Sequence, residues 1–395
     1  MMSRNLVKKG IAVVLSTLLA FGGVLLPSYA SESAEDVSLE TNSSMDLNCK
    51  GAILMDATTG TVLYEQNADE ALPPASVTKI MTLLLVMEAI DSGAVKLTDM
   101  VNTSANAASM GGSQIYLEEG EQMTVEDMVK SVVIASANDA AVALAEHVAG
   151  SEEEFVARMN RRAAELGMKT ARFENTNGLD DTAENHVLSA RDIAIMSREL
   201  IKHKVILDYS SIWMDTVRNG EFGLTNTNRL VRFYKGATGL KTGSTSKAKF
   251  CVSATAERDG MHLVCVVMGA DTRDERNAIA AKLLDYGFAN YSLFTSSGKA
   301  LDEIRVLGGI ENTCGIAYGD FSAVVKKGEG GKIDSVIEIN DAVAAPVSVG
   351  TTVGKVIYKL GDAVLGEVDI VTTEAIPKIG FWGFLARVLA GIALK

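Results

Sequence analysis

Residues 76–90 read Ser-Val-Thr-Lys-Ile-Met-Thr-Leu-Leu-Leu-Val-Met-Glu-Ala-Ile, a long apolar stretch with the character of a helix. Ser76 and Lys79 stand three residues apart at its start, so their side chains share one face. At that end, free backbone N–H groups and the helix dipole favour negative charge on Ser76. A serine becomes a nucleophile only when a base removes its proton, and a neutral lysine one turn away is within reach.

Lys79 can act as this base only if it is uncharged. The ordinary lysine pKa is about 10.4, so work near pH 7 requires a depression of about three units, or roughly 4–5 kcal/mol. Burial and a nearby cation both lower a lysine pKa, and Lys241 is the candidate cation. The alternative is a solvated helix lysine, but neighbours such as Ile80, Met81 and Leu83 make this helix unusually apolar.

A second motif, Ser136-Ala137-Asn138, interrupts the helical pattern of residues 124–149. On a regular helix Ser136 and Asn138 would point about 200° apart. Only a turn between two helices can therefore aim both side chains into one cleft. The alternative is a plain helix cap, because Ser and Asn are favoured capping residues.

The third motif, Lys241-Thr242-Gly243, ends an extended segment that begins at Gly236. Gly243 has no side chain, so a substrate backbone could approach the strand edge there. Lys241 and Thr242 supply a cation and a hydroxyl suited to a carboxylate. Strand alternation would aim these two at opposite faces, so both serve one site only where the strand twists. The alternative for Lys241 is a solvated surface lysine.

Strand-like runs open and close the first part of the chain, and helical patterns fill its middle. This order predicts an α+β fold with one mostly antiparallel sheet covered by helices. The expected strands are 51–56, 61–66, 239–242, 250–256 and 262–268, and the expected helices are 76–90, 152–166, 189–202 and 277–291. From residue 298, short β-prone runs separated by Gly pairs predict a small all-β domain.

Composition narrows the possible functions. The chain has 395 residues, 47% of them apolar and 22% charged, which is enough to bury a sizeable core. Acidic residues outnumber basic ones by 50 to 37, giving a net charge of −13, so nucleic acid is not an expected partner. The four Cys and four His lack metal-site spacing, and no metal or other cofactor is expected. We expect Cys251 and Cys265, on successive strands, to be buried thiols, and Cys49 and Cys314 to be structural.

The N-terminus has the pattern of a signal peptide over residues 1–30. Arg4, Lys8 and Lys9 precede an apolar run over 11–26, and Ser28-Tyr29-Ala30 forms a cleavage site. Cleavage removes three basic residues and takes the net charge from −13 to −16. The alternative is an uncleaved membrane anchor. A polar linker, 31–47, would then lead into the first domain, 48–297.

A second membrane signal lies at the C-terminus, after the β-rich domain of residues 298–375. Residues 376–395 include an apolar run interrupted by Arg387, too short to span a bilayer. Because Phe381, Trp382, Phe384 and Leu385 gather on one side, we expect an amphipathic helix in the membrane surface. The alternative is a tail that packs on the protein's own surface. The protein would then be secreted across the cytoplasmic membrane and held peripherally on its outer face.

The three motifs, in this order and on these elements, are signatures of penicillin-binding proteins and class A β-lactamases. Further runs narrow the choice: Gly112-Ser113-Gln114-Ile115-Tyr116-Leu117, Ser136-Ala137-Asn138-Asp139-Ala140 and Phe173-Glu174-Asn175-Thr176-Asn177-Gly178-Leu179. With them, the chain resembles the low-molecular-mass penicillin-binding proteins of the peptidase S11 family, serine-type D-alanyl-D-alanine carboxypeptidases of cell-wall metabolism. The resemblance covers roughly residues 48 to 395, and it implies that the α+β domain has a β-lactamase/transpeptidase-like fold.

This resemblance implies that Ser76 forms an acyl-enzyme with the penultimate D-Ala of the peptidoglycan pentapeptide and releases the terminal D-Ala. Lys79 would act as general base, and Ser136 would relay a proton toward the leaving amine. Asn138 would hold the peptide amide. Peptidoglycan stem peptides would be the substrates, and β-lactam antibiotics would be covalent inhibitors.

The resemblance also implies how the substrate is held. Lys241 and Thr242 would bind the terminal carboxylate, beside the glycine of their motif. The backbone N–H groups of Ser76 and Ser244 would form the oxyanion hole, a contribution typically worth roughly 3–4 kcal/mol. Arg276, just before the closing helix, would add positive charge near the carboxylate.

Two features depart from the family pattern. The family usually has Ala-Gly after Lys-Thr-Gly, where this chain has Ala248-Lys249, which leaves the shape of the substrate rim open. The loop over 180–186 looks longer than usual, and we expect His186 to be a structural histidine.

Two other functions have to be distinguished from a carboxypeptidase: a β-lactamase and a catalytically idle binding module. A class A β-lactamase needs a carboxylate for the deacylating water, usually in Glu-x-x-Leu-Asn, and residues 136–241 contain no such motif. A catalytically idle module that senses wall peptides or β-lactams is disfavoured by the intact Ser76, Lys79 and Lys241.

Overall fold

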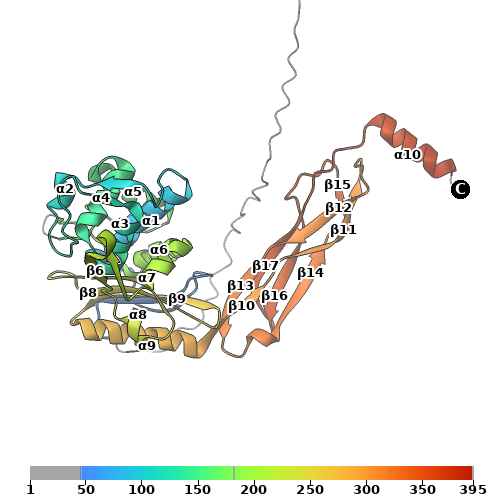
Figure 1. The fold of residues 1–395 in the computed structure, drawn as a ribbon. Coiled ribbons are helices and arrows are strands. Elements are labelled where there is room, and N and C mark those ends of the chain that lie inside the picture. Colours follow the sequence, from blue (N-terminus) through green and yellow to red (C-terminus); the bar gives the residue numbers. More distant parts are fainter. Residues whose placement is uncertain (1–44, 46, 181–182, 394–395) are drawn as a thin grey trace, which may run out of the picture. The chain divides into compact units, whose positions relative to one another are not determined.

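The computed structural model describes residues 45, 47–180 and 183–393. The predicted signal peptide and nearly all of the predicted linker lie outside the described residues. The described part of the chain begins with a five-stranded antiparallel sheet in the order β2-β1-β9-β8-β7 (Figure 1). Its strands are β1 (Gly51–Asp56), β2 (Val62–Gln66), β7 (Ala237–Thr245), β8 (Lys249–Arg258) and β9 (Met261–Ala270).

The predicted hairpin between β8 and β9 is confirmed. Asp259 and Gly260 both have positive φ, 51° and 78°, as expected of a tight turn whose twist matches that of the strands. Successive β9 side chains face opposite sides of the sheet. Val264 and Val266 belong to the core under the helix cluster, and Cys265 belongs to the core under α9 (Arg273–Asn290).

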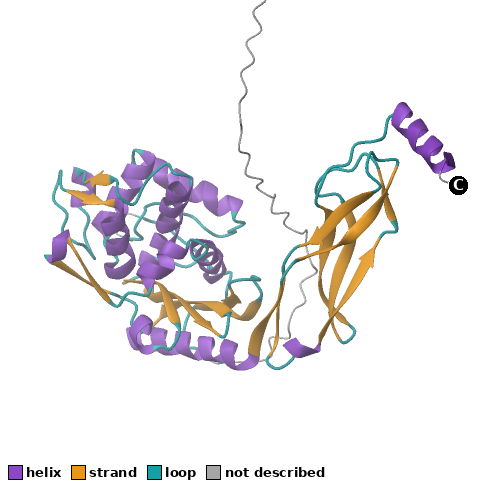
Figure 2. Ribbon diagram, turned by 45° about the vertical axis from the view of Figure 1, so that its right-hand side comes forward, coloured by secondary structure: helices purple, strands orange, loops and turns teal. Residues whose placement is uncertain are grey.

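Helices cover this sheet, as predicted, and the structure places them on both of its faces. The long helix α9 lies along one face and a cluster of helices covers the other (Figure 2). The cluster is formed by α1 (Lys79–Asp91), α2 (Ala105–Ala108), α3 (Val125–Lys130), α4 (Asn138–Ala149), α5 (Glu152–Glu165), α6 (Ala190–Leu200) and α7 (Lys204–Ser210). The short helix α8 (Leu230–Phe233) is not part of it, because Leu230 belongs to the core under α9. Most of α1 is buried, which agrees with its apolar sequence.

Two expected helices differ from the observed ones at the site. The helical stretch that carries Ser76 begins as a 3-10 turn, Ala75–Thr78, before α1. The pattern over 124–149 divides into α3, a π-helical turn Ser131–Ala135 and α4, with the predicted break at Ser136.

Four short strands form two antiparallel pairs that the sequence patterns did not indicate. They are β3 (Met100–Asn102) with β4 (Gln122–Thr124), and β5 (Met214–Val217) with β6 (Phe222–Thr225). Three or four residues are too few for a periodic signal.

The second domain is all-β, as predicted, with its own buried core. It contains a six-stranded sheet in the order β14-β16-β17-β12-β11-β15 and a two-stranded sheet of β10 and β13. These strands are β10 (Tyr291–Ser296), β11 (Lys299–Leu307), β12 (Thr313–Tyr318), β13 (Phe321–Lys326), β14 (Ile333–Ile339), β15 (Ala342–Ala344), β16 (Thr352–Leu360) and β17 (Ala363–Thr372). Because β10 pairs along its length with β13, this domain's sheet structure begins at Tyr291.

The described chain ends in the helix α10 (Phe381–Ala393). Its large apolar side chains are exposed, with Phe381 and Trp382 at 70% and 78%. Among the described helices, none combines the length and the apolar character needed to cross a bilayer.

Candidate active site

The three motifs meet beside the start of α1. Lys79 Nζ lies 2.9 Å from Ser76 Oγ, and Lys241 Nζ lies 2.7 Å from Ser136 Oγ. The third motif touches the first, because the backbone of Gly243 packs against the backbone of Ser76. One site therefore contains a serine–lysine pair from the first motif and a second such pair shared by the other two.

Close backbone packing fixes the turn that carries Ser76. A Cβ on Gly243 would lie 2.8 Å from Ser76 N and 2.9 Å from Pro74 O, and a Cβ on Gly178 would lie 1.9 Å from Ala75 O. Ala75 itself has a φ of 50°, in the left-handed region. The sequence had suggested that Gly243 gives a substrate backbone room to approach. The structure shows a different reason, since the nucleophile's own turn occupies that space.

Lys79 is fully buried. Its Nζ lies 2.7 Å from the backbone oxygen of Asn177, in addition to its contact with Ser76. Burial holds the pKa of Lys79 well below its ordinary value, the charge of Lys241 lowers it further, and Asp139 opposes both. The solvated helix lysine is therefore wrong, and burial contributes more to the depression than the predicted cation does.

These two contacts orient a neutral amine. A neutral lysine has two N–H donors and one lone pair, whereas a carbonyl oxygen can only accept. Lys79 therefore donates to Asn177 O, and its lone pair can face the Ser76 hydroxyl. This is the arrangement that a general base needs. The backbone carbonyl of Asn177 gave no sequence signal, although the sequence had singled out its segment.

The turn between α3 and α4 aims the second motif. Ser136 has a φ of 65°, and Ala137 N–H donates to Ser131 O, so the chain reverses before α4 begins at Asn138. The capping alternative is wrong, because Ala137 is the N-cap and no side chain caps this helix. Asn138 Nδ2 donates to Gly111 O at 2.6 Å, and its buried Oδ1 has no partner among the described residues.

Asp139 holds the loop that follows Gly111, a role the sequence did not assign. Its buried carboxylate accepts hydrogen bonds from Ile115 N and Leu117 N, each at 3.1 Å. Between them, Tyr116 is 69% exposed, with a φ of 57°. Arg218 Nη1 donates to Ile115 O at 2.7 Å, which secures the loop from the other side. Contacts of this kind join side chains to a distant backbone and leave no local pattern.

Lys241 is buried, so the surface-lysine alternative is wrong. Burial, helped by the charge of Arg276, lowers the pKa of Lys241 to about 7. Thr242 is also largely buried, and its hydroxyl lies 2.8 Å from that of Thr227, a residue the sequence did not indicate. Ser244 follows Gly243 at the exposed end of β7.

We predicted that Arg276 lies just before the closing helix. It lies instead inside the first turn of that helix, because α9 begins at Arg273. The residue is 3% exposed, and its guanidinium donates to Asn277 Oδ1 at 2.9 Å and to Cys251 O at 3.4 Å. These bonds tie its guanidinium to its own helix and to β8. Its charge, together with burial, nevertheless lowers the pKa of Lys241.

All four cysteines are free thiols. Cys265 pairs in register with Ala254, well along the hairpin from Cys251. Cys251 belongs to the core under the helix cluster, whereas Cys265 belongs to the core under α9. The expectation of buried thiols at these two positions is therefore confirmed.

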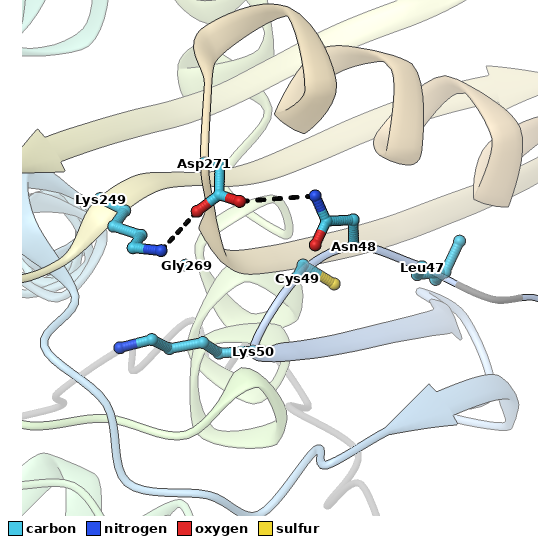
Figure 3. A pocket seen from close by; sticks show the side chains of 7 residues that line it. All are labelled: Leu47, Asn48, Cys49, Lys50, Lys249, Gly269 and Asp271. Carbon is cyan, nitrogen blue, oxygen red and sulfur yellow. Dashed lines mark hydrogen bonds and ion pairs between the residues drawn. The ribbon is translucent and has the colours of Figure 1, made fainter.

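Lys249, which stands where the family usually has glycine, lines a separate cavity of about 460 Å³ (Figure 3). Lys249 has a φ of 55°, a conformation that glycine adopts without strain. Its side chain forms an ion pair with Asp271, which also lies 3.5 Å from Asn48 Nδ2. None of the motif residues lines this cavity. Lys249 therefore meets the backbone demand for which glycine is suited, and its charge is directed away from the motifs.

Comparison with known proteins agrees with this geometry. A family model described as D-alanyl-D-alanine carboxypeptidase, peptidase S11, matches residues 38–272. A second model, the C-terminal domain of penicillin-binding protein 5, matches residues 290–378.

Individual relatives match over most of the chain. D-alanyl-D-alanine carboxypeptidase DacF of Bacillus subtilis is 42% identical over 95% of this chain and 97% of its own. The structure of penicillin-binding protein 5 from Haemophilus influenzae has a TM-score of 0.75 at 31% identity, covering 85% of this chain and 99% of that one. Penicillin-binding protein D2 of Listeria monocytogenes, in its ampicillin-bound form, has a TM-score of 0.58 at 32% identity, covering 62% and 100%.

Proposed function

The chain belongs to the peptidase S11 family of D-alanyl-D-alanine carboxypeptidases, and we propose that it removes the terminal D-Ala of peptidoglycan pentapeptides through an acyl-enzyme on Ser76. The observation that carries the proposal is the buried contact of 2.9 Å between Lys79 Nζ and Ser76 Oγ. With Asn177 O accepting an N–H of Lys79, the amine's lone pair can take the serine proton.

The first half of the reaction forms the acyl-enzyme. As the Ser76 proton passes to Lys79 Nζ, Ser76 Oγ bonds to the carbonyl carbon of the penultimate D-Ala. Negative charge develops on the carbonyl oxygen, which the N–H groups of Ser76 and Ser244 stabilise. The C–N bond then breaks, and the leaving amine of the terminal D-Ala takes a proton relayed through Ser136. Water later hydrolyses the ester and regenerates the serine.

In this proposal, side chains hold two parts of the substrate, its terminal carboxylate and its peptide amide. Lys241 and Thr242 bind the terminal carboxylate, and Arg276 adds to the positive field from behind Lys241. Asn138 holds the peptide amide. Its unpartnered buried Oδ1 supports this role, because a buried acceptor without a partner costs roughly 1–3 kcal/mol until a donor arrives.

We also propose that β-lactams acylate Ser76. Their carboxylate would occupy the place of the terminal D-Ala carboxylate at Lys241. The ampicillin-bound Listeria relative supports this extension, at 32% identity to this chain. Slow deacylation is expected, because the sequence between Ser136 and Lys241 lacks the Glu-x-x-Leu-Asn motif.

The cellular location belongs to the same proposal. Residues 1–30 would direct secretion and be removed, and α10 would hold the enzyme at the outer face of the membrane. The apolar side chains at 381, 384, 385, 388 and 392 recur at helical spacing and are exposed, which supports a surface-bound helix.

The test is release of free D-Ala from diacetyl-Lys-D-Ala-D-Ala, together with mass spectrometry of the protein after exposure to penicillin. The wild-type chain should release D-Ala and gain one covalent adduct on Ser76. Ser76→Ala should do neither. A wild-type protein that binds the tripeptide but releases no D-Ala would instead be the idle binding module. Rapid penicillin turnover without a lasting adduct would identify a β-lactamase.

A further inference from the structure

The segment between α5 and α6 lies against the start of α1. Its ends are joined by two backbone hydrogen bonds between Arg172 and Val187, at 2.9 and 3.1 Å. Three side chains of the α1 region point into it, and all three are fully buried. Thr82 Oγ1 donates to Thr176 O at 2.5 Å, Lys79 Nζ donates to Asn177 O at 2.7 Å, and Thr78 Oγ1 meets His186 Nε2 at 2.8 Å.

His186 joins the two arms of this segment to the α1 region. Its Nδ1 lies 3.1 Å from Glu174 N, a donor, so Nδ1 accepts and the neutral ring carries its hydrogen on Nε2. Nε2 therefore donates to Thr78 Oγ1. Burial lowers the pKa of His186 to about 4, which keeps the ring in this neutral form near neutral pH. Phe173 supports the ring edge-on, with centroids 5.7 Å apart.

The backbone carbonyl that orients the general base lies between Glu174 and His186, the two residues that the ring contact joins. Asn177 is three residues beyond Glu174, and Asn177 O receives an N–H of Lys79. If that carbonyl turned away, the Lys79 amine could direct an N–H at the Ser76 hydroxyl instead of its lone pair. The base would then be close to the nucleophile but wrongly oriented.

We propose that His186 is a positioning residue for the general base, fixing the Asn177 carbonyl so that the Lys79 lone pair faces Ser76. The sequence led us to expect a structural histidine; the contacts give it a specific task in acylation. This inference rests on the proposed role of Lys79. It concerns the acylation step and not substrate binding, because the described contacts of His186 do not include Lys241 or Asn138.

Three variants test it. His186→Phe keeps a ring against Phe173 and removes both ring nitrogens. His186→Gln keeps one N–H donor and one acceptor in a side chain of similar reach. His262→Phe is the matched control, because His262 is also largely buried and its Nε2 lies 2.9 Å from a threonine hydroxyl, that of Thr238. The acylation rate constant and the dissociation constant are separated by following penicillin acylation over a range of concentrations, on the full chain.

We expect His186→Phe to lower the acylation rate constant by about tenfold or more, with the dissociation constant changed by less than about twofold. His186→Gln should restore the rate to within about threefold of wild type, and His262→Phe should acylate at the wild-type rate. Wild-type acylation and D-Ala release, measured alongside, test the proposed function itself. If that activity is intact while His186→Phe acylates normally, the inference is overturned. It is also overturned if His262→Phe slows acylation as much, or if both His186 variants lose only thermal stability.

Discussion

Gly243→Ala tests whether this glycine makes room for the nucleophile's own turn or for the substrate. The new Cβ would lie 2.8 Å from Ser76 N and 3.0 Å from Val77 N, both backbone atoms that cannot rotate away. The turn has to move by about 0.6 Å to lengthen this contact from 2.8 Å to an ordinary 3.4 Å. Since a misplacement of 1 Å can cost about 100-fold in rate, we expect acylation to slow on the order of tenfold. Overpacking should also lower the free energy of unfolding by about 1–3 kcal/mol.

The assay separates the rate constant of acylation from the dissociation constant, using a small β-lactam and the tripeptide in parallel. Displacement of Ser76 slows acylation by both ligands and leaves binding nearly unchanged. The control is Gly223→Ala in β6, where an added Cβ has no atom within 4 Å and φ is ordinary. The reasoning is refuted if Gly243→Ala acylates at the wild-type rate but binds both ligands more weakly, since that is the pattern of a blocked substrate path.

Four further predictions concern Lys241, Arg276, Lys249 and the C-terminal helix. Because burial lowers the pKa of Lys241 to about 7, its charged form declines above that pH, so KM for the tripeptide should rise between about pH 7 and 9. Arg276→Gln removes a neighbouring cation, raises the pKa of Lys241 and should move this rise to higher pH in the same KM measurements. Lys249→Gly should relieve a positive φ and raise the free energy of unfolding by up to about 1 kcal/mol in urea denaturation, with unchanged D-Ala release. Truncation after Pro377 should leave activity on the soluble tripeptide intact and abolish sedimentation with lipid vesicles, and co-sedimentation of the truncated chain would contradict membrane attachment through α10.

Local sequence patterns were sufficient to predict the regular helices and strands of the fold. Strand-like runs on either side of Arg258-Asp259-Gly260 located β8 and β9, and the apolar run after Ser76 located α1. The spacing of Ser76 and Lys79 placed both groups on one face, and their contact follows from that spacing. These features depend on neighbours within a few residues, which is the range over which a sequence period carries information.

The groups that orient the site could not be found in this way. Lys79 is oriented by a backbone carbonyl 98 positions away, and Asp139 binds backbone N–H groups 22 and 24 positions away. A backbone acceptor or donor is present at almost every residue, so no residue type marks it. The sequence also did not show why position 243 is a glycine. The space beside Gly243 is filled by the backbone of a distant turn, and backbone atoms leave no sequence signal.

The site depends on three residues whose backbone conformation neither a helix nor a strand provides. Ala75, Tyr116 and Ser136 have φ values of 50°, 57° and 65°, and each such conformation costs a residue with a side chain roughly 1–2 kcal/mol. Each lies where the chain must turn sharply: before the nucleophile, beside the loop that Asp139 holds, and between two helices. Because regular elements would aim Ser136 and Asn138 apart, these turns bring the motifs into one site. The buried hydrogen bonds of Asp139 and the partly buried one of Arg218 hold the turn at Tyr116 in place. Strain here is therefore a condition of the geometry, and relieving it should stabilise the fold at the expense of acylation.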